Sequence, residues 1–94
     1  MSIYLTAIVK SKVETTATLR TVLLDMVANS RKEEACIQYD LHESAADHTF
    51  IFQEEWKDQP GLDLHNQQSY ILAFVEQAGA LTDDVVIYKT EKLA

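Results

Sequence analysis

Glu54, Trp56 and His65 have the types and spacing that best suit acid–base chemistry in this chain. Glu54 alternates with aromatic residues in TFIFQEEW, so it points to the apolar side of a predicted strand. Such a carboxylate is either paired, for example with Arg31, or has a raised pKa, so a structural glutamate and a pocket acid both stay open. Trp56 either belongs to the core or walls a cavity. His65 titrates near neutrality and suits general-base catalysis.

The other potentially reactive residues favour no known type of catalytic site. His42 lies on the polar face of a predicted strand, where a structural or interface role is expected, and His48 lies in a turn. Cys36 is expected to be a small buried hydrophobic residue. No two histidines have metal-ligand spacing, and Gly61 and Gly79 form no phosphate loop. We therefore expect neither a metal nor a nucleotide cofactor.

Composition restricts the partners and the compartment. The 94 residues predict a single domain, 1–94, and the net charge of −7 disfavours nucleic acid and anionic membranes. One cysteine excludes an intrachain disulfide, and no apolar run approaches the ~20 residues of a membrane span. The start of the chain, MSIYLTAIVK, lacks the pattern of a signal peptide, so we expect a cytoplasmic protein.

The acid–base residues must be positioned by strands and helices that the hydrophobic pattern predicts. Four segments have the alternation or the β-branched and aromatic composition of strands, namely 3–9, 36–43, 49–56 and 84–93. A capping box of Ser11 and Glu14 predicts the start of a first helix. Asp58, followed by Pro60, predicts a short helix that places Leu62 and His65 on one side. The nearest candidate partners of that histidine are then a glutamate, Glu54, or a tyrosine hydroxyl.

The last predicted helix begins at Ser69 and has Gly79 as its C-terminal cap. The resulting order, β-α-β-β-α-β, is that of the ferredoxin-like α+β fold, with a four-stranded antiparallel sheet and helices on one face. The first and last strands are apolar on both sides, and 47% of all residues are apolar or aromatic. We therefore expect a homodimer in which two sheets pack face to face.

Two segments of the chain resemble motifs of one family, the antibiotic biosynthesis monooxygenases, which are small dimeric α+β barrel domains. SRKEEACIQYDL is similar to the family pattern S-R-x-E-x-G-C-x-x-Y, and the matching residues are Ser30, Arg31, Glu33, Cys36 and Tyr39. EEWKDQPGLDLH is similar to E-x-W-x(8)-H, and the matching residues are Glu54, Trp56 and His65. The resemblance extends over nearly the whole chain.

Two departures from the family pattern bear on mechanism. Ala35 stands where relatives have glycine, and Tyr70 stands where many relatives have a second histidine, so a two-histidine mechanism is not implied. The haem-degrading branch of the family needs an asparagine on the first strand, which 3–9 lacks, so haem is disfavoured.

The resemblance implies oxidation of a quinol-like or polycyclic phenol by O₂ without metal or flavin. It implies that His65 is the catalytic base and that Glu54 orients it. The residues implied to contact the aromatic substrate are Trp56, Phe50, Phe52, Tyr39, Tyr70 and Arg31. Two alternatives stay open: an isomerase of a small phosphorylated signalling sugar, which would need basic residues at the pocket, and a non-catalytic dimeric binding or stress-response domain.

Overall fold

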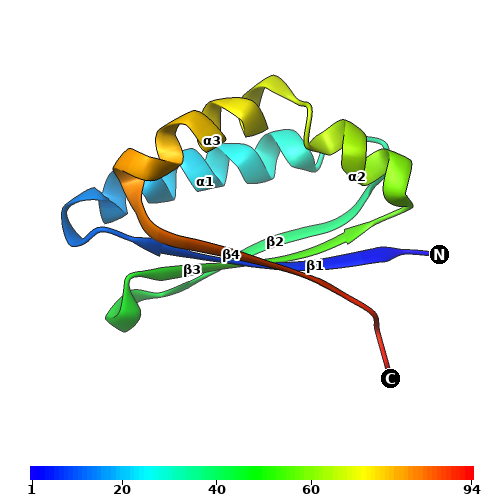
Figure 1. Ribbon diagram of the computed structural model, residues 1–94, viewed down its shortest axis with the longest axis horizontal. Coiled ribbons are helices and arrows are strands. Elements are labelled where there is room, and N and C mark those ends of the chain that lie inside the picture. Colours follow the sequence, from blue (N-terminus) through cyan, green and yellow to red (C-terminus); the bar gives the residue numbers. More distant parts are fainter.

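The computed structural model describes all residues, Met1–Ala94. Three helices cover one face of a four-stranded sheet, and the other face is free of helices (Figure 1). The elements are β1 Ile3–Ser11, α1 Thr16–Ser30, β2 Cys36–Ser44, β3 Thr49–Trp56, α2 Gln59–His65, α3 Ser69–Leu81 and β4 Thr82–Thr90, with 3₁₀ turns at Val13–Thr15 and Ala45–Asp47. None of the helices is long and apolar enough to cross a membrane.

The sheet has the order β2-β3-β1-β4, and every neighbouring pair is antiparallel. The predicted ferredoxin-like α+β fold is therefore confirmed. Central strand β1 places Ala7 opposite Phe52 of β3 and Ile87 of β4, so three strands contribute side chains to the same level of the helix-facing surface. The edge strands are β2 and β4.

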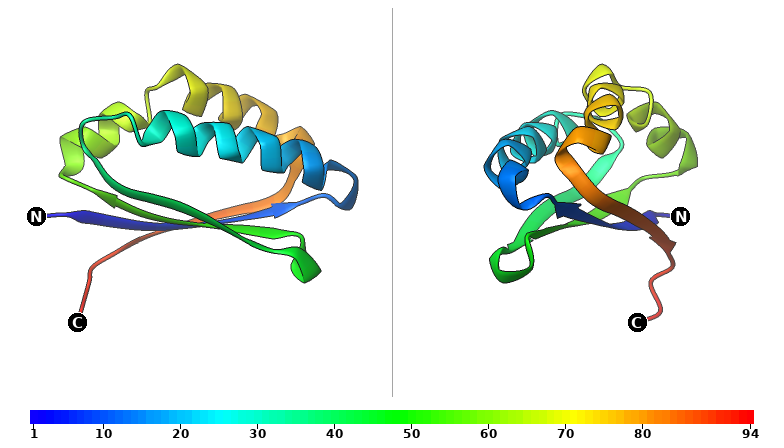
Figure 2. Two further views of the ribbon diagram at one scale, coloured as in Figure 1. Left: turned by 180° about the vertical axis from the view of Figure 1, so that it is seen from behind. Right: turned by 60° about the vertical axis from the view of Figure 1, so that its left-hand side comes forward.

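The core lies between the sheet and α1. On β3, alternate residues are buried, as the sequence predicted: Phe50, Phe52, Glu54 and Trp56. Helix α1 contacts this layer through Leu19 and Leu23, both fully buried. In contrast, Ile71 is the only buried residue of α3, because this helix stands away from the sheet (Figure 2).

The predicted capping box is wrong. Ser11 is the last residue of β1, and its backbone N–H donates to the carbonyl of His48. Its hydroxyl lies 2.7 Å from Oγ1 of Thr16 and 3.2 Å from the His48 oxygen, so these contacts occupy the proposed cap. Helix α1 begins only at Thr16, after the 3₁₀ turn, and has no side-chain cap.

The predicted ends of α3 also differ from the structure. Ser69 makes no capping hydrogen bond, and Gly79 lies inside the helix, which continues to Leu81. The chain then enters β4 directly, without a left-handed residue, and the Thr82 hydroxyl donates to the Ala78 carbonyl at 2.6 Å. The side-chain bond replaces a glycine cap, and β4 therefore begins two residues earlier than predicted.

Candidate active site

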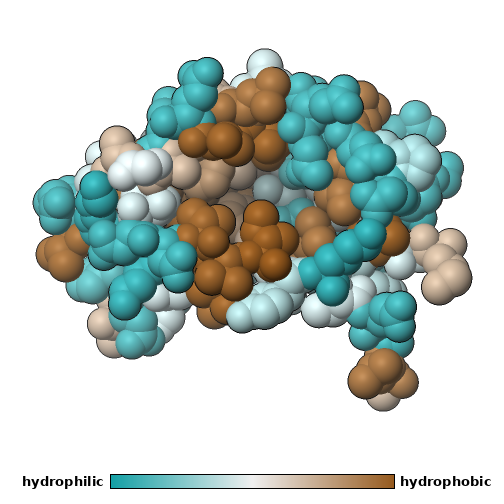
Figure 3. All heavy atoms as spheres, viewed as in Figure 1, coloured by the Kyte–Doolittle hydropathy of each residue, from teal (hydrophilic) through white to brown (hydrophobic).

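A cavity of about 330 Å³ lies between the sheet and α3. Its walls are mostly apolar, with side chains from β1, α3 and β4 that include Leu5, Val9, Phe74, Val75 and Ile87. In Figure 3 the molecule is hollowed here between two groups of hydrophobic side chains. Val75 and Ile87 remain 64% and 62% exposed, so the cavity opens to the outside between α3 and β4.

Four residues bring polar atoms to this apolar cavity, namely Tyr39, Glu54, His65 and Asn66, and no lysine or arginine lines it. Glu54 is only 7% exposed, and its Oε1 accepts a hydrogen bond from Nε1 of Trp56 at 2.9 Å. Burial raises the pKa of Glu54 to about 7, while the Trp56 bond opposes the rise and the charge of Glu33 adds to it. Glu54 can therefore be a neutral acid or an anion near neutral pH.

His65 is the last residue of α2 and is 4% exposed. Its Nδ1 lies 2.7 Å from Oε2 of Glu33, and the Tyr70 hydroxyl donates to the same oxygen. The partner is thus Glu33, and the expectation that Glu54 or a tyrosine hydroxyl would bind His65 directly is wrong. Burial lowers the pKa of His65 and so favours the neutral ring, while the hydrogen bond and charge of Glu33 act in the opposite direction.

Aromatic rings fix the plane of the His65 imidazole. Its centroid lies 4.2 Å from that of Trp56, with 38° between the planes, and 5.6 Å from that of Tyr39 at 61°. Nε2 makes no hydrogen bond within the chain. The imidazole is therefore held at one nitrogen and along its faces, while the other nitrogen has no protein partner.

Close packing at the start of α2 positions His65. The Asp58 carboxylate accepts the N–H of Gly61 at 2.8 Å, which confirms the predicted cap, and Leu62 and His65 are both buried, also as predicted. A Cβ on Gly61 would lie 2.3 Å from the Cβ of Ala35, so glycine allows α2 to approach the loop before β2. This loop also carries Glu33, and the approach therefore brings the carboxylate to the imidazole.

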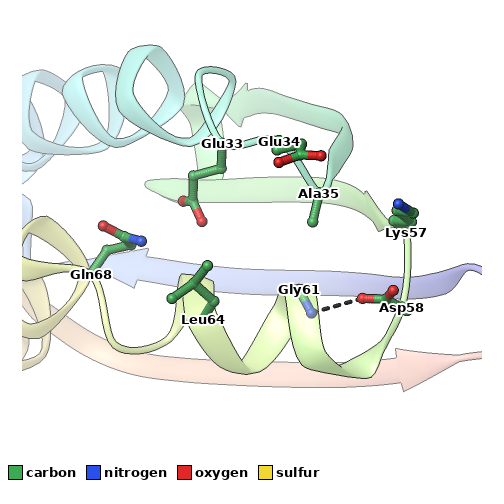
Figure 4. Close-up of a pocket in the computed structure, with 8 residues that line it drawn as sticks. All are labelled: Glu33, Glu34, Ala35, Lys57, Asp58, Gly61, Leu64 and Gln68. Carbon is green, nitrogen blue, oxygen red and sulfur yellow. Dashed lines mark hydrogen bonds between the residues drawn. The ribbon is translucent and has the colours of Figure 1, made fainter.

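A second, polar pocket of about 360 Å³ lies on the outer side of this contact. Figure 4 shows Glu33, Glu34 and Ala35 on one side of it and the α2 residues Gly61 and Leu64 on the other. Glu33 therefore borders the outer pocket and contacts His65, which lines the apolar cavity.

Comparisons with known proteins assign the chain to one family. The model of the family described as "Antibiotic biosynthesis monooxygenase" matches residues 2–77. The chain belongs to the antibiotic biosynthesis monooxygenase family. It is 34% identical over 80 residues to "Putative monooxygenase YcnE" of Bacillus subtilis, with 84% of each chain covered.

Two solved structures of similar proteins support the family fold. The chain is 32% identical to PA3566 of Pseudomonas aeruginosa, with a TM-score of 0.92 and coverage of 99% and 95% of the two chains. It is 25% identical to Rv0793 of Mycobacterium tuberculosis, with a TM-score of 0.93 and coverage of 100% and 97%.

The residues that the sequence predicted for the site do not all lie at the cavity. Tyr39, Phe52, Glu54 and His65 line the cavity. Phe50 and Trp56 are buried and lie outside its lining, and Tyr70 borders a different shallow pocket while its hydroxyl reaches Glu33.

Arg31 lies away from the cavity in this family member. Its Nε donates to the Tyr39 carbonyl at 3.0 Å, its terminal nitrogen contacts Asp40 at 3.0 Å, and its side chain is 57% exposed. It does not pair with Glu54, so the interpretation of a glutamate neutralised by Arg31 is wrong. In this chain it cannot touch a ligand in the cavity without leaving these partners.

Glu33 is the functional candidate that the residue types did not single out. It lies in a run of charged residues, RKEE, where a solvated side chain is the usual expectation. The available signal was its place in the S-R-x-E family motif. Burial raises the pKa of the Cys36 thiol to about 11, which disfavours the reactive thiolate. No group of three or more histidine, cysteine or acidic residues is placed so that it could hold a metal.

Proposed function

We propose that the protein is a cofactor-independent monooxygenase that oxidises a quinol-like aromatic with O₂. The observation that carries the proposal is the position of His65, which lines an apolar cavity with Nε2 unpartnered and Nδ1 held by Glu33. A histidine held in this way has the arrangement of a general base.

The reaction needs a base, an apolar enclosure and a substrate rich in electrons. His65 takes a hydroxyl proton from the quinol, and the resulting anion transfers an electron to O₂. Recombination forms a peroxide at a ring carbon, and loss of water leaves a hydroxylated quinone, so quinol and O₂ give hydroxyquinone and H₂O. Glu54, in its neutral form, donates a hydrogen bond to a developing oxyanion, which a low-dielectric cavity makes effective.

The size and charge of the cavity favour this substrate class over a phosphorylated sugar. Its volume of about 330 Å³ lies at the lower end of small-ligand sites, which span about 300–1,000 Å³. A phosphate group needs arginine, lysine or several backbone donors, and no cationic side chain lines the cavity. A non-catalytic binding domain would be favoured by a cavity filled with side chains, and this one is open.

The homodimer is part of the proposal. The helix-free face of the sheet carries a cluster of apolar side chains, in which Ile8 of β1 is paired with Ile51 of β3 and Val86 of β4, and Tyr88 is 53% exposed. Packing two such faces together would bury these residues. This supports a dimer of sheets as the assembled enzyme.

Oxygen labelling tests the proposed function. The purified protein, treated with a chelator, is incubated with simple quinols under ¹⁸O₂ and the product is analysed by mass spectrometry. We expect protein-dependent O₂ uptake and one labelled oxygen atom in the quinone. Uptake no faster than in buffer, across quinols of one to three rings that bind the protein, would contradict the proposal.

A further inference from the structure

We propose that Glu33 is a positioning residue that keeps the proton of neutral His65 on Nδ1, and that Tyr70 holds Glu33 in place for this role. The inference deepens the proposed function, because it explains which nitrogen of His65 faces the substrate as the base. Neither residue is assigned contact with the substrate. Glu33 acts through the imidazole, and Tyr70 acts through Glu33.

The hydrogen bonds at one carboxylate oxygen carry the first step. Oε2 of Glu33 lies 2.7 Å from Nδ1 of His65 and also accepts the Tyr70 hydroxyl. An ionised carboxylate only accepts hydrogen bonds, so both neighbours must donate. The proton of the neutral imidazole is therefore on Nδ1. Glu33 has no other hydrogen-bond partner for its side chain, so this oxygen serves His65 and Tyr70 alone.

The second step concerns the nitrogen left over. With the proton on Nδ1, Nε2 carries a lone pair and has no partner in the chain, while the ring borders the apolar cavity. A neutral histidine side chain in water prefers the opposite tautomer, with the proton on Nε2, and a protonated Nε2 cannot accept a substrate proton. The buried contact, with side-chain exposures of 5% for His65 and 12% for Glu33, reverses that preference where water competes little.

Other charged groups around His65 do not supply this acceptor. Tyr39 of β2 and Tyr70 of α3 present rings to it, and Glu54 of β3 lines the same cavity with one oxygen bound to Trp56. No lysine or arginine lines the cavity. Glu33 is thus the acidic group in contact with the imidazole.

The tautomer is measured directly in the protein without substrate. Histidine-labelled protein is titrated by ¹⁵N NMR, with long-range couplings that identify the protonated nitrogen of His65. We expect Nδ1–H in the wild type and mainly Nε2–H in Glu33→Ala and in Glu33→Leu, which has a similar size without an acceptor and serves if the alanine variant folds poorly. Glu34→Ala is the matched control, since Glu34 is exposed, borders the same outer pocket and makes no side-chain hydrogen bond. We expect it to match the wild type.

A kinetic readout separates positioning from a purely structural role. With a quinol that the wild type oxidises, Glu33→Leu should lower kcat about 10²-fold with KM little changed. In the same variant, the pKa of His65 read from the pH dependence of kcat should fall, since Glu33 raises the pKa of His65 in the wild type. Tyr70→Phe should give a smaller loss of kcat in the same direction.

Two results would overturn the inference. One is Nε2–H as the main neutral form in the wild type, and the other is an Nδ1–H form that persists in both Glu33 variants. These NMR results do not depend on turnover. A wild type that oxidises no quinol would therefore refute the proposed function, while the role of Glu33 in setting the tautomer would still be decided by the NMR result.

Discussion

The indole Nε1 of Trp56 donates to Oε1 of Glu54 at 2.9 Å, between two side chains on the same face of β3. The bond leaves the other carboxylate oxygen without a partner in a residue that lines the cavity. The strand therefore presents to any ligand in the cavity a carboxyl group with one oxygen bound to Trp56 and the other free to form a hydrogen bond.

We expect Trp56→Phe to raise the pKa of Glu54 above about 7, because the lost hydrogen bond favoured the anion. The unpaired buried oxygen should also lower the free energy of unfolding by about 1–3 kcal/mol. Carboxyl ¹³C NMR titration and urea unfolding measure the two effects. A pKa of Glu54 that is unchanged or lowered in the variant would show that the indole does not stabilise the carboxylate.

Glu54 should make the protein less stable as pH rises. Its pKa is raised from 4.5 in the unfolded chain to about 7 in the folded protein, so the folded state binds the extra proton between these values. Its contribution is complete below the lower value and is lost as pH rises through the higher one. The loss is about 3 kcal/mol, at about 1.4 kcal/mol per pH unit. Urea unfolding should show the wild type losing this free energy relative to Glu54→Gln, which does not titrate at residue 54, as pH rises from about 4.5 to above 7. A difference in unfolding free energy that stays constant with pH would contradict the prediction.

Gly61→Ala should displace α2 and reduce stability. The added methyl would lie 2.3 Å from the Cβ of Ala35, and overpacking of this kind costs about 1–3 kcal/mol. Gly79→Ala is the matched control, because a Cβ there has no atom within 4 Å, and it should stabilise α3 by about 0.4–1 kcal/mol. Thermal unfolding measures both. Equal changes in stability for the two substitutions would mean that the close approach of α2 to Ala35 does not require a glycine at position 61.

Filling the cavity should block ligand binding. Ala78 lines the cavity on α3, so Ala78→Phe should raise the Kd or KM for an aromatic ligand at least about tenfold, since several kcal/mol of apolar contact are lost. Ala80→Phe adds the same ring at an exposed position outside the cavity and should bind as the wild type does. Calorimetry with a quinol gives the constants. Unchanged binding by Ala78→Phe would place the ligand site elsewhere.

The strand β3 could be predicted because one of its faces is buried, and apolar residues therefore alternate with polar ones along its sequence. Helix ends were less predictable. Ser11 and Glu14 match a capping box, yet the pairing of β1 holds Ser11 in the sheet and gives its hydroxyl other partners. A local motif cannot report a hydrogen bond made by residue 48.

The candidate site was predictable where it lies on one strand or one helix turn. Glu54 and Phe52 share a strand face, and Leu62 and His65 share a helix side. The pairing of Glu33 with His65 joins residues 32 apart in the chain, and it depends on Gly61 packing on Ala35. No spacing rule connects these positions, so residue types alone pointed to the wrong partner.

The most direct measurement of the central claim is O₂ consumption by chelator-treated wild type and His65→Ala on a quinol that the wild type oxidises. Gln67→Ala is the control, because Gln67 is exposed, lies outside the cavity and makes no side-chain hydrogen bond in the structure. We expect kcat to fall by about 10²–10⁴ in His65→Ala, with the fold retained, and to stay unchanged in Gln67→Ala. Wild-type rates in a folded His65→Ala protein would contradict the claim that His65 is the base.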